Sequence, residues 1–317
     1  MNRIASLLLL LLSAQLSAHA HTATYKCRKW HIPAANYSGI TPLGDGCYAV
    51  VSDQEEQAGF YLWNIHVDLS SGQLLEMESL GWKGTPYPID RDAEGIAWCE
   101  PRQSFFVSGE ADQRILEHRL DGSLTGYELQ VPSSMDIHHI QTNRGFEALT
   151  YDPFTRLFWT VTESPLRGDE PLRLRMQSFS LSLQPEHEYP YRLDAPQSVP
   201  TGRDYYHGVV ALAPFGNGRL LVLEREARIA RRYAGSRCWC KLFLFDPSTG
   251  SKRLLHVCSS RFTLFNTRFA NYEGMCLGPT LLDGRPTVLL LSDSQGGYGK
   301  VFWHLRDRLR IIVLDKE

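Results

Sequence analysis

Several features that would identify common protein classes are absent from this sequence. Beyond its first twenty residues it has no apolar run approaching ~18 residues, the length that a membrane-spanning helix needs. It contains no Gly-x-Ser-x-Gly nucleophile elbow and no Walker phosphate-binding loop. Its 33 basic residues are balanced by 35 acidic ones, and a net charge of −2 argues against a general nucleic-acid binder. Helical periodicity is also scarce, so an all-β protein is expected.

The cysteines do not form a recognisable zinc motif. Seven are present, an odd number, and the Cys238-x-Cys240 pair has no matching second pair. We interpret them as small buried thiols. Because Cys238 and Cys258 flank an expected hairpin turn at residues 246–250, one bridge between these two strands is the alternative.

The first twenty residues have the pattern of a secretory signal peptide. Arg3 precedes an apolar core that contains six consecutive leucines, and Ala18-His19-Ala20 is a small-x-small cleavage signal. We therefore expect residues 1–20 to be removed and the protein to be periplasmic or extracellular. Residues 21–317 are expected to form a single domain, without a membrane span, that acts as a monomer.

A short motif recurs along the chain and indicates an internal repeat. A marked residue precedes a small residue and an apolar run, as in Asp92-Ala-Glu-Gly-Ile96, and the marked residues are spaced roughly 53–66 residues apart. The marked residues are Ser38, Glu94, Glu147, His207 and Glu273. In each unit a turn and a second apolar run follow, as in a β-hairpin. The second runs end at a second set of marked residues, namely Asp53, Glu110, Glu163, Glu224 and Asp293.

Units of this length with four strands each predict a β-propeller of four-stranded antiparallel blades. The repeat count favours five blades, with six as the alternative. Closure is expected by pairing of the chain ends, near Thr24–Trp30 and Arg310–Leu314. Because the midpoint between the two marked residues of each unit falls in or beside the expected turn, those two residues should face each other across the hairpin.

The repeated motifs resemble those of the phytase-like esterase family, the group described as "esterase-like activity of phytase". The resemblance lies in Asp92-Ala-Glu-Gly-Ile-Ala-Trp98, Phe146-Glu-Ala-Leu149, Leu221-Val-Leu-Glu-Arg225 and Tyr272-Glu-Gly-Met275, and it covers most of residues 21–317. It implies an exported propeller with hydrolase activity and a role for calcium. Five blades, and His207 and Ser38 in place of Glu, depart from the family's six-bladed pattern.

Eight carboxylates would converge on the channel of such a propeller, because the first strand of each blade lines it. Calcium takes 6–8 oxygen ligands and fits this set. The candidate metal ligands are Glu94, Glu147, Glu273, Glu110, Glu163, Glu224, Asp53 and Asp293. The alternative is that these carboxylates accept hydrogen bonds from backbone amides of the next blade.

Arginines precede four of the marked residues, and their planar guanidinium groups suit an anionic substrate. They are Arg91, Arg144, Arg203 and Arg268. Alternatively, each pairs with an acid of its own blade. His207, which breaks the repeat, is a candidate general base, a ligand or a tolerated variant, and Glu147 is the second catalytic candidate. A run of four arginines between residues 225 and 232 is interpreted as a solvated strand edge.

The function favoured by these features is metal-assisted hydrolysis of phosphate or other esters at the channel mouth, with a small anionic ester as substrate. Two alternatives are a non-catalytic propeller that binds a glycan or a protein on the same face, and a lactonase-like enzyme. Fold alone does not distinguish them.

Overall fold

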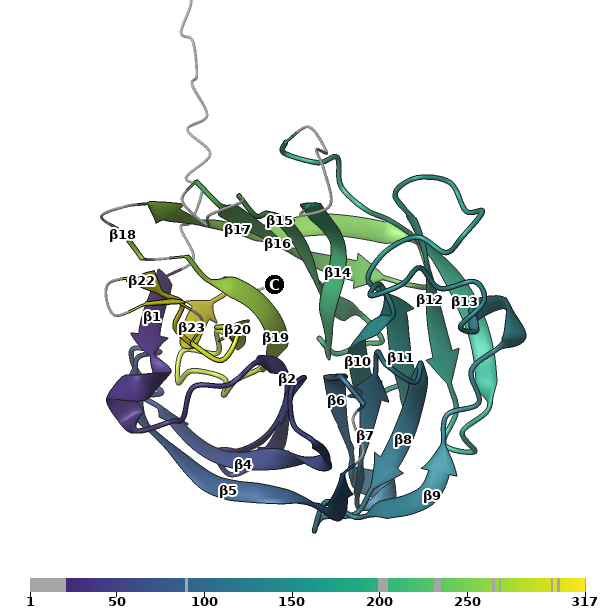
Figure 1. The fold of residues 1–317 in the computed structure, drawn as a ribbon, viewed down its shortest axis with the longest axis horizontal. Helices are drawn as coiled ribbons and strands as arrows, with labels where there is room; N and C mark the ends of the chain where they lie inside the picture. The colour runs from purple at the N-terminus through teal and green to yellow at the C-terminus, as the bar shows by residue number, and fades with distance from the viewer. Residues whose placement is uncertain are drawn as a thin grey trace, which may run out of the picture.

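The chain forms a five-bladed β-propeller, as predicted (Figure 1). The computed structural model describes residues 21–88, 91–198, 205–230, 235–263, 266–267, 269–297, 299–300 and 303–316. The expected signal peptide, Arg203 and Arg268 lie outside these residues. Within the described part of the chain, no helix is long and apolar enough to cross a membrane.

The first three blades are consecutive four-stranded antiparallel sheets. Blade 1 comprises β2 (Tyr37–Gly44), β3 (Cys47–Ser52), β4 (Gln57–Val67) and β5 (Leu74–Pro88). Blade 2 comprises β6 (Ala93–Cys99), β7 (Ser104–Gly109), β8 (Arg114–His118) and β9 (Leu124–Glu128). Blade 3 comprises β10 (Phe146–Asp152), β11 (Leu157–Thr162), β12 (Arg173–Phe179) and β13 (Pro185–Arg192).

The last two blades carry the irregular features of the ring. Blade 4 comprises β14 (Tyr205–Pro214), β15 (Leu220–Arg228), β16 (Arg237–Asp246), β17 (Ser251–Thr263) and the short β18 (Asn266–Thr267). Blade 5 comprises β19 (Asn271–Leu277), β20 (Thr287–Asp293), β23 (Arg308–Val313) and β1 (His21–Lys26). A two-stranded hairpin, β21 (Gly299–Lys300) and β22 (Trp303–His304), lies between β20 and β23 in the sequence. Three single-turn 3₁₀ helices complete the described elements: η1 (Cys27–Trp30), η2 (Glu100–Arg102) and η3 (Ser133–Met135).

The ends of the chain close the ring. Strand β1 pairs antiparallel with β23, with Thr24 opposite Arg310, so the first strand becomes the outer strand of the last blade (Figure 1). This pairing confirms the predicted closure, except that residues 27–30 form η1 rather than a continuation of the strand. Pairing the two ends leaves the ring without an open blade edge at the closure.

Five hydrophobic clusters hold the blades together, one at each interface between neighbouring blades. Val51 of blade 1 packs with Ile96 of blade 2, for example, and Val210 of blade 4 packs with Met275 of blade 5. Burial of apolar surface between sheets therefore stabilises the ring at every junction. The inner strands β2, β6, β10, β14 and β19 surround the centre (Figure 1).

Candidate functional site

The marked residues of four blades are the extra residues of β-bulges. The register between the first and second strands shifts at Ser38, at Glu94 with Gly95, at Glu147 and at Glu273. A bulge leaves its residue unpaired and re-aims the side chain. All four residues line one narrow space at the centre of the propeller. We call the residues at this level the inner ring.

The fourth member of the inner ring is Val210, not His207. The bulge in blade 4 lies between Val209 and Ala211, and Val210 lines the same central space as Glu94 and Glu147. His207 instead pairs with Glu226 of β15. The sequence prediction took Gly208 as the small residue that follows the mark, whereas Ala211 has that place.

Close approach of neighbouring inner strands explains why a small residue follows each inner-ring position. A Cβ added at Gly39 would lie 2.4 Å from the carbonyl oxygen of Glu94. One added at Gly95 would lie 2.7 Å from the carbonyl oxygen of Glu147. The recurring Glu-Gly and Glu-Ala pairs are therefore a packing requirement of the ring as well as a source of carboxylates.

The second set of marked residues follows the same correction. In blades 1, 2, 3 and 5 the positions at the end of the second strand are Asp53, Glu110, Glu163 and Asp293. Because Val209 pairs with Glu224, the equivalent residue of blade 4 is Arg225. We call these five the strand-end set, and together with the inner ring and Asp92 they form the acidic mouth.

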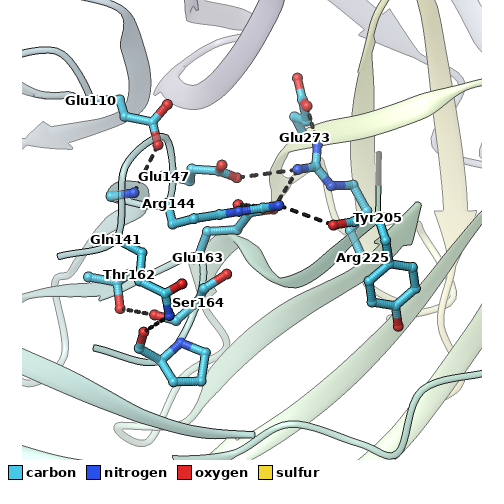
Figure 2. Close-up of polar contacts among 12 residues, drawn as sticks. Glu110, Gln141, Arg144, Glu147, Thr162, Glu163, Ser164, Tyr205, Arg225 and Glu273 are labelled. Atoms are coloured by element: carbon cyan, nitrogen blue, oxygen red, sulfur yellow. Dashed lines mark hydrogen bonds and ion pairs between the residues drawn. The ribbon is translucent and has the colours of Figure 1, made fainter. Parts of the chain in front are cut away.

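Arg225 is the buried cation of the acidic mouth. Its guanidinium donates to Glu163 Oε1 at 2.8 Å and to Glu273, and lies 3.8 Å from Glu147 Oε2. Figure 2 shows this guanidinium among the carboxylates of blades 3 and 5. Its side chain is only 5% exposed, so the interpretation of residues 225–232 as a solvated edge is wrong at Arg225. In the sequence, the only signal was the break in the acidic pattern itself.

Glu224 lies away from the acidic mouth. Its carboxylate accepts a hydrogen bond from Tyr191 Oη at 2.8 Å and pairs with Lys252 Nζ at 2.5 Å. Successive residues of a strand point to opposite faces, so Arg225 faces the channel when Glu224 faces the interface with blade 3. The structure therefore removes Glu224 from the candidate metal ligands.

Burial and mutual repulsion raise the pKa values of the remaining carboxylates. Burial and Glu147, Glu273 and Asp53 raise the pKa of Glu94 well above its ordinary value. Burial and Glu163 raise that of Glu147, which Arg225 partly opposes. The pKa of Glu273 rises to about 8, chiefly through burial. The pKa values of Glu110 and Asp293 are also raised, chiefly by burial.

Three carboxylates of the acidic mouth have the arrangement of a cation site. Asp53, Asp92 and Glu94 each offer an oxygen, and these oxygens all lie within 4.8 Å of one another. Asp53 Oδ1 is buried without a hydrogen-bond partner. Burial and the nearby Asp293 and Glu273 raise the pKa of Asp53 to about 8. An all-oxygen set with an unsatisfied buried oxygen fits a hard divalent cation such as Ca²⁺. Asp92, two residues before Glu94, was not among the predicted ligands.

Backbone hydrogen bonds account for part of the predicted ring. Glu110 Oε1 accepts the Gly145 N–H of blade 3 at 2.8 Å, and Ser38 Oγ donates to the Ala93 carbonyl of blade 2 at 2.6 Å. Asp293 Oδ1 accepts the Gln295 N–H within its own loop. For Glu110 and Ser38, contact with the next blade is thus the interaction that the structure displays.

The two arginines that the structure describes have different environments. Arg91 is 2% exposed, pairs with Asp112 at 2.8 Å and donates to the carbonyls of Val107 and Arg114. It braces blade 2 and is too deeply buried to contact a substrate, contrary to the prediction. Arg144 is 18% exposed and joins Glu163 Oε2, at 2.7 Å, to the Tyr205 carbonyl of blade 4 (Figure 2).

His207 is held near the interface of blades 3 and 4, outside the inner ring. Burial lowers its pKa, although Glu224 and Glu226 partly oppose that effect. Its ring centroid lies 6.4 Å from that of Tyr205. The imidazole is therefore predominantly neutral at pH 7.

An apolar constriction divides the channel below the inner ring. The residues that follow each small residue line both the central space and a cavity of about 720 Å³ at the opposite end. They are Ile40, Ile96, Leu149, Leu212 and Met275. On the acidic side, a recess of about 250 Å³ is lined by Arg225 and Glu273 together with Tyr206, Ile229 and Phe269. The propeller thus has one acidic end and one apolar end.

Comparisons with solved structures show the propeller fold. The endo-arabinase from Bacteroides thetaiotaomicron VPI-5482 is 13% identical, with a TM-score of 0.51, over 90% of this chain and 95% of that one. The GH62 α-L-arabinofuranosidase catalytic domain from Coprinopsis cinerea is 13% identical, with a TM-score of 0.45, over 89% and 90% of the two chains. The tail fiber of Staphylococcus aureus phage P68 is 12% identical, with a TM-score of 0.47, and this chain covers 50% of its length. The match to a hydrazine synthase from Kuenenia stuttgartiensis covers 58% of that chain.

Sequence comparison identifies the family. No curated protein matches the chain. The family model described as "Esterase-like activity of phytase" matches residues 32–295, which is most of the chain and includes all five inner strands. The protein therefore belongs to the phytase-like family.

Proposed function

We propose that the protein is an exported hydrolase that cleaves a small anionic ester at the acidic mouth, with the assistance of a bound divalent cation. The observation that carries this proposal is the convergence of Asp53, Asp92 and Glu94 on one point beside the channel. The family description, which names esterase-like activity, supports the choice of an ester substrate.

The charge balance of the acidic mouth supports cation binding. Arg225 and Arg144 compensate Glu147, Glu163 and Glu273, but neither has a printed contact with Asp53 or Glu94. Buried carboxylates without a counter-charge are expensive, and a cation is one means of keeping them ionised. Ca²⁺ held by Asp53, Asp92 and Glu94 would neutralise them and polarise an ester or phosphoryl oxygen.

The chain's own residues can bind and orient the substrate. The recess beside Arg225 and Glu273 has apolar walls from Tyr206, Ile229 and Phe269. Such walls exclude water and suit an ester with an apolar group, whereas a fully charged polyphosphate would leave them unpaired. Arg144, more exposed than Arg225, is the better placed of the two to contact an anion.

Glu147 is the proposed proton donor. Its raised pKa keeps a proton on the carboxyl near neutral pH, as a general acid requires. The carboxyl lies at the centre of the inner ring, where it can protonate the departing oxygen. Glu147→Gln keeps the shape but removes the acid, so we expect turnover to fall by roughly 10²–10⁴-fold with little change in folding.

The decisive experiment measures calcium binding and hydrolysis on the same samples. Ca²⁺ should raise the Tm of EDTA-treated protein, because a ligand that binds only the folded state stabilises it. Asp53→Asn and Glu94→Gln should weaken that response, while Glu78→Gln, an exposed change on β5, should not. Hydrolysis of p-nitrophenyl phosphate and p-nitrophenyl butyrate should then depend on Ca²⁺. Absence of both the Tm response and hydrolysis would refute the proposal.

A second candidate function, glycan binding without catalysis, is favoured by the cavity at the apolar end. Trp98 and Tyr151 line this cavity of about 720 Å³ together with Glu100 and Gln103. Aromatic faces beside a few polar groups suit the stacking of sugar rings. A glycan-array signal that Trp98→Ala abolishes and Glu94→Gln leaves unchanged would favour this function over hydrolysis at the acidic mouth.

A further inference from the structure

Three cysteines form a compact group at the interface of blades 4 and 5. Cys238 and Cys240 are two residues apart on β16, so they share a face of that strand, and their sulfur atoms lie 3.9 Å apart. Cys258 of β17 is directly opposite Cys240 in the antiparallel register. All seven cysteines of the chain are free thiols in this structure.

The register allows a covalent bond between the two strands. Directly opposed residues of antiparallel strands have Cα atoms about 4.5–5.5 Å apart, within the ~4.4–6.8 Å range that disulfides span. Cys240 and Cys258 meet this condition. The bridge considered from the sequence alone, Cys238 to Cys258, does not, because Cys238 is opposite Ser260.

The three thiols differ in access and reactivity. Cys258 is half-buried, whereas Cys238 and Cys240 are buried. The contact with Cys240 and the Arg310 guanidinium lower the pKa of Cys258 to about 7, and the pKa of Cys240 is raised well above its ordinary value. A thiol that is both accessible and largely ionised near neutral pH is the one that attacks a disulfide.

We propose that Cys258 and Cys240 form a reversible disulfide, with a low-molecular-weight disulfide as oxidant. The Cys258 thiolate attacks one sulfur of the oxidant, which forms a mixed disulfide and releases one thiolate. Cys240 then loses its proton and attacks the Cys258 sulfur, which releases the second thiolate. Two protein thiols are oxidised and one small disulfide is reduced to two thiols.

The bridge would connect an accessible strand with the strand that flanks the acidic mouth. Cys240 is also directly opposite Arg225 in the pairing of β15 with β16. The bond would close a loop over the β16–β17 hairpin and so restrict the unfolded chain. We expect the oxidised protein to have a Tm roughly 5–10 °C above that of the reduced protein.

Peptide mapping tests the pairing directly. Reduced protein is treated with oxidised glutathione, the remaining thiols are alkylated, and the protein is digested with chymotrypsin and trypsin. Cleavage after Trp239 separates Cys238 from Cys240. The expected product is a Cys240–Cys258 peptide with the Cys238 peptide alkylated.

Variants distinguish the role of each thiol. Cys258→Ser should abolish the cross-link and the Tm shift, and Cys240→Ser should accumulate a glutathione adduct on Cys258. Cys47→Ser, which removes the other half-buried cysteine, should leave the cross-link in place. The proposal fails if wild-type protein yields only the adduct, if all three thiols stay alkylatable, or if Cys238 is the partner.

Discussion

Arg225 Nη2 donates to Glu163 Oε1 at 2.8 Å across the interface of blades 3 and 4, with both side chains almost fully buried. The same guanidinium also reaches Glu273 of blade 5. One residue of blade 4 thus joins the two blades that flank it at the centre of the propeller. It does so from a position at which the other four blades carry an acid, and its charge is what allows several carboxylates to lie so close together.

We predict that Arg225→Gln strongly destabilises the protein. Removal of one partner of a buried ion pair leaves uncompensated charge, which costs about 3–5 kcal/mol in comparable cases. Protonation of Glu163 or Glu273 would recover part of that cost, so the loss should be smaller at low pH. Urea unfolding followed by tryptophan fluorescence measures the effect. Arg228→Gln, at the exposed end of the same strand, is the control. Equal stabilities of the two variants would contradict a central role for Arg225.

We predict that the metal-free protein loses stability as pH rises from about 4 to 8. Burial raises the folded-state pKa of Glu273 to about 8 and that of Asp307 to about 7, whereas unfolded carboxyls titrate near 4. The folded state therefore holds more protons than the unfolded state within this window, and the free energy of unfolding falls as they are released. Thermal unfolding in EDTA at several pH values measures the slope.

Asp307 provides a control for that slope. It lies apart from the proposed cation site and accepts the Ala35 N–H at 3.4 Å. Asp307→Asn should flatten the slope up to about pH 7 and keep the response to Ca²⁺. A metal-free protein that becomes more stable toward pH 8 would show that these carboxyls are ionised when folded.

The architecture could be predicted from the sequence because its signals are local. Alternating apolar runs and turns define the hairpins, and the recurrence of Glu-Gly or Glu-Ala counts the blades. The pairing of Thr24 with Arg310 follows once five units and two loose ends are recognised. Each of these inferences needs only strand periodicity and turn chemistry.

The site was less predictable because it depends on register and on contacts between blades. Gly208 and Ala211 are both small and both precede apolar residues, so a shift of three residues put His207 in the place of Val210. That shift exchanged Arg225 for Glu224. An arginine at a strand end is usually solvated, and only acids from two other blades explain the burial of Arg225. No pattern within β15 carries that information.

We predict that Gly39→Ala and Gly95→Ala destabilise the ring more than Gly274→Ala does. The added Cβ would lie 2.4 and 2.7 Å from carbonyl oxygens of the next inner strand, but 3.2 Å at Gly274. Backbone atoms cannot move aside cheaply, and overpacking of this kind costs about 1–3 kcal/mol. Chemical denaturation of the three variants ranks them. If Gly274→Ala were the most damaging, close approach of the inner strands would not explain the repeated small residue.

The last prediction separates the two arginines that the structure describes near the acidic mouth. Arg91 is enclosed by Asp112 and two backbone carbonyls of its own blade, so Arg91→Ala should lower Tm while the activity per folded molecule is unchanged. Arg144 is more exposed, and Arg144→Ala should raise KM about ten- to a hundred-fold if it contacts the anionic ester, since a charge-assisted hydrogen bond is worth roughly 1.5–3 kcal/mol. Arg144 also joins Glu163 to blade 4, so Tm must be measured on the same samples. Arg144→Lys keeps the charge but not the two-pronged geometry, and it should restore KM only in part. A fall in Tm with normal kinetics for Arg144→Ala would assign both arginines to bracing the blades and would move the substrate away from this side of the mouth.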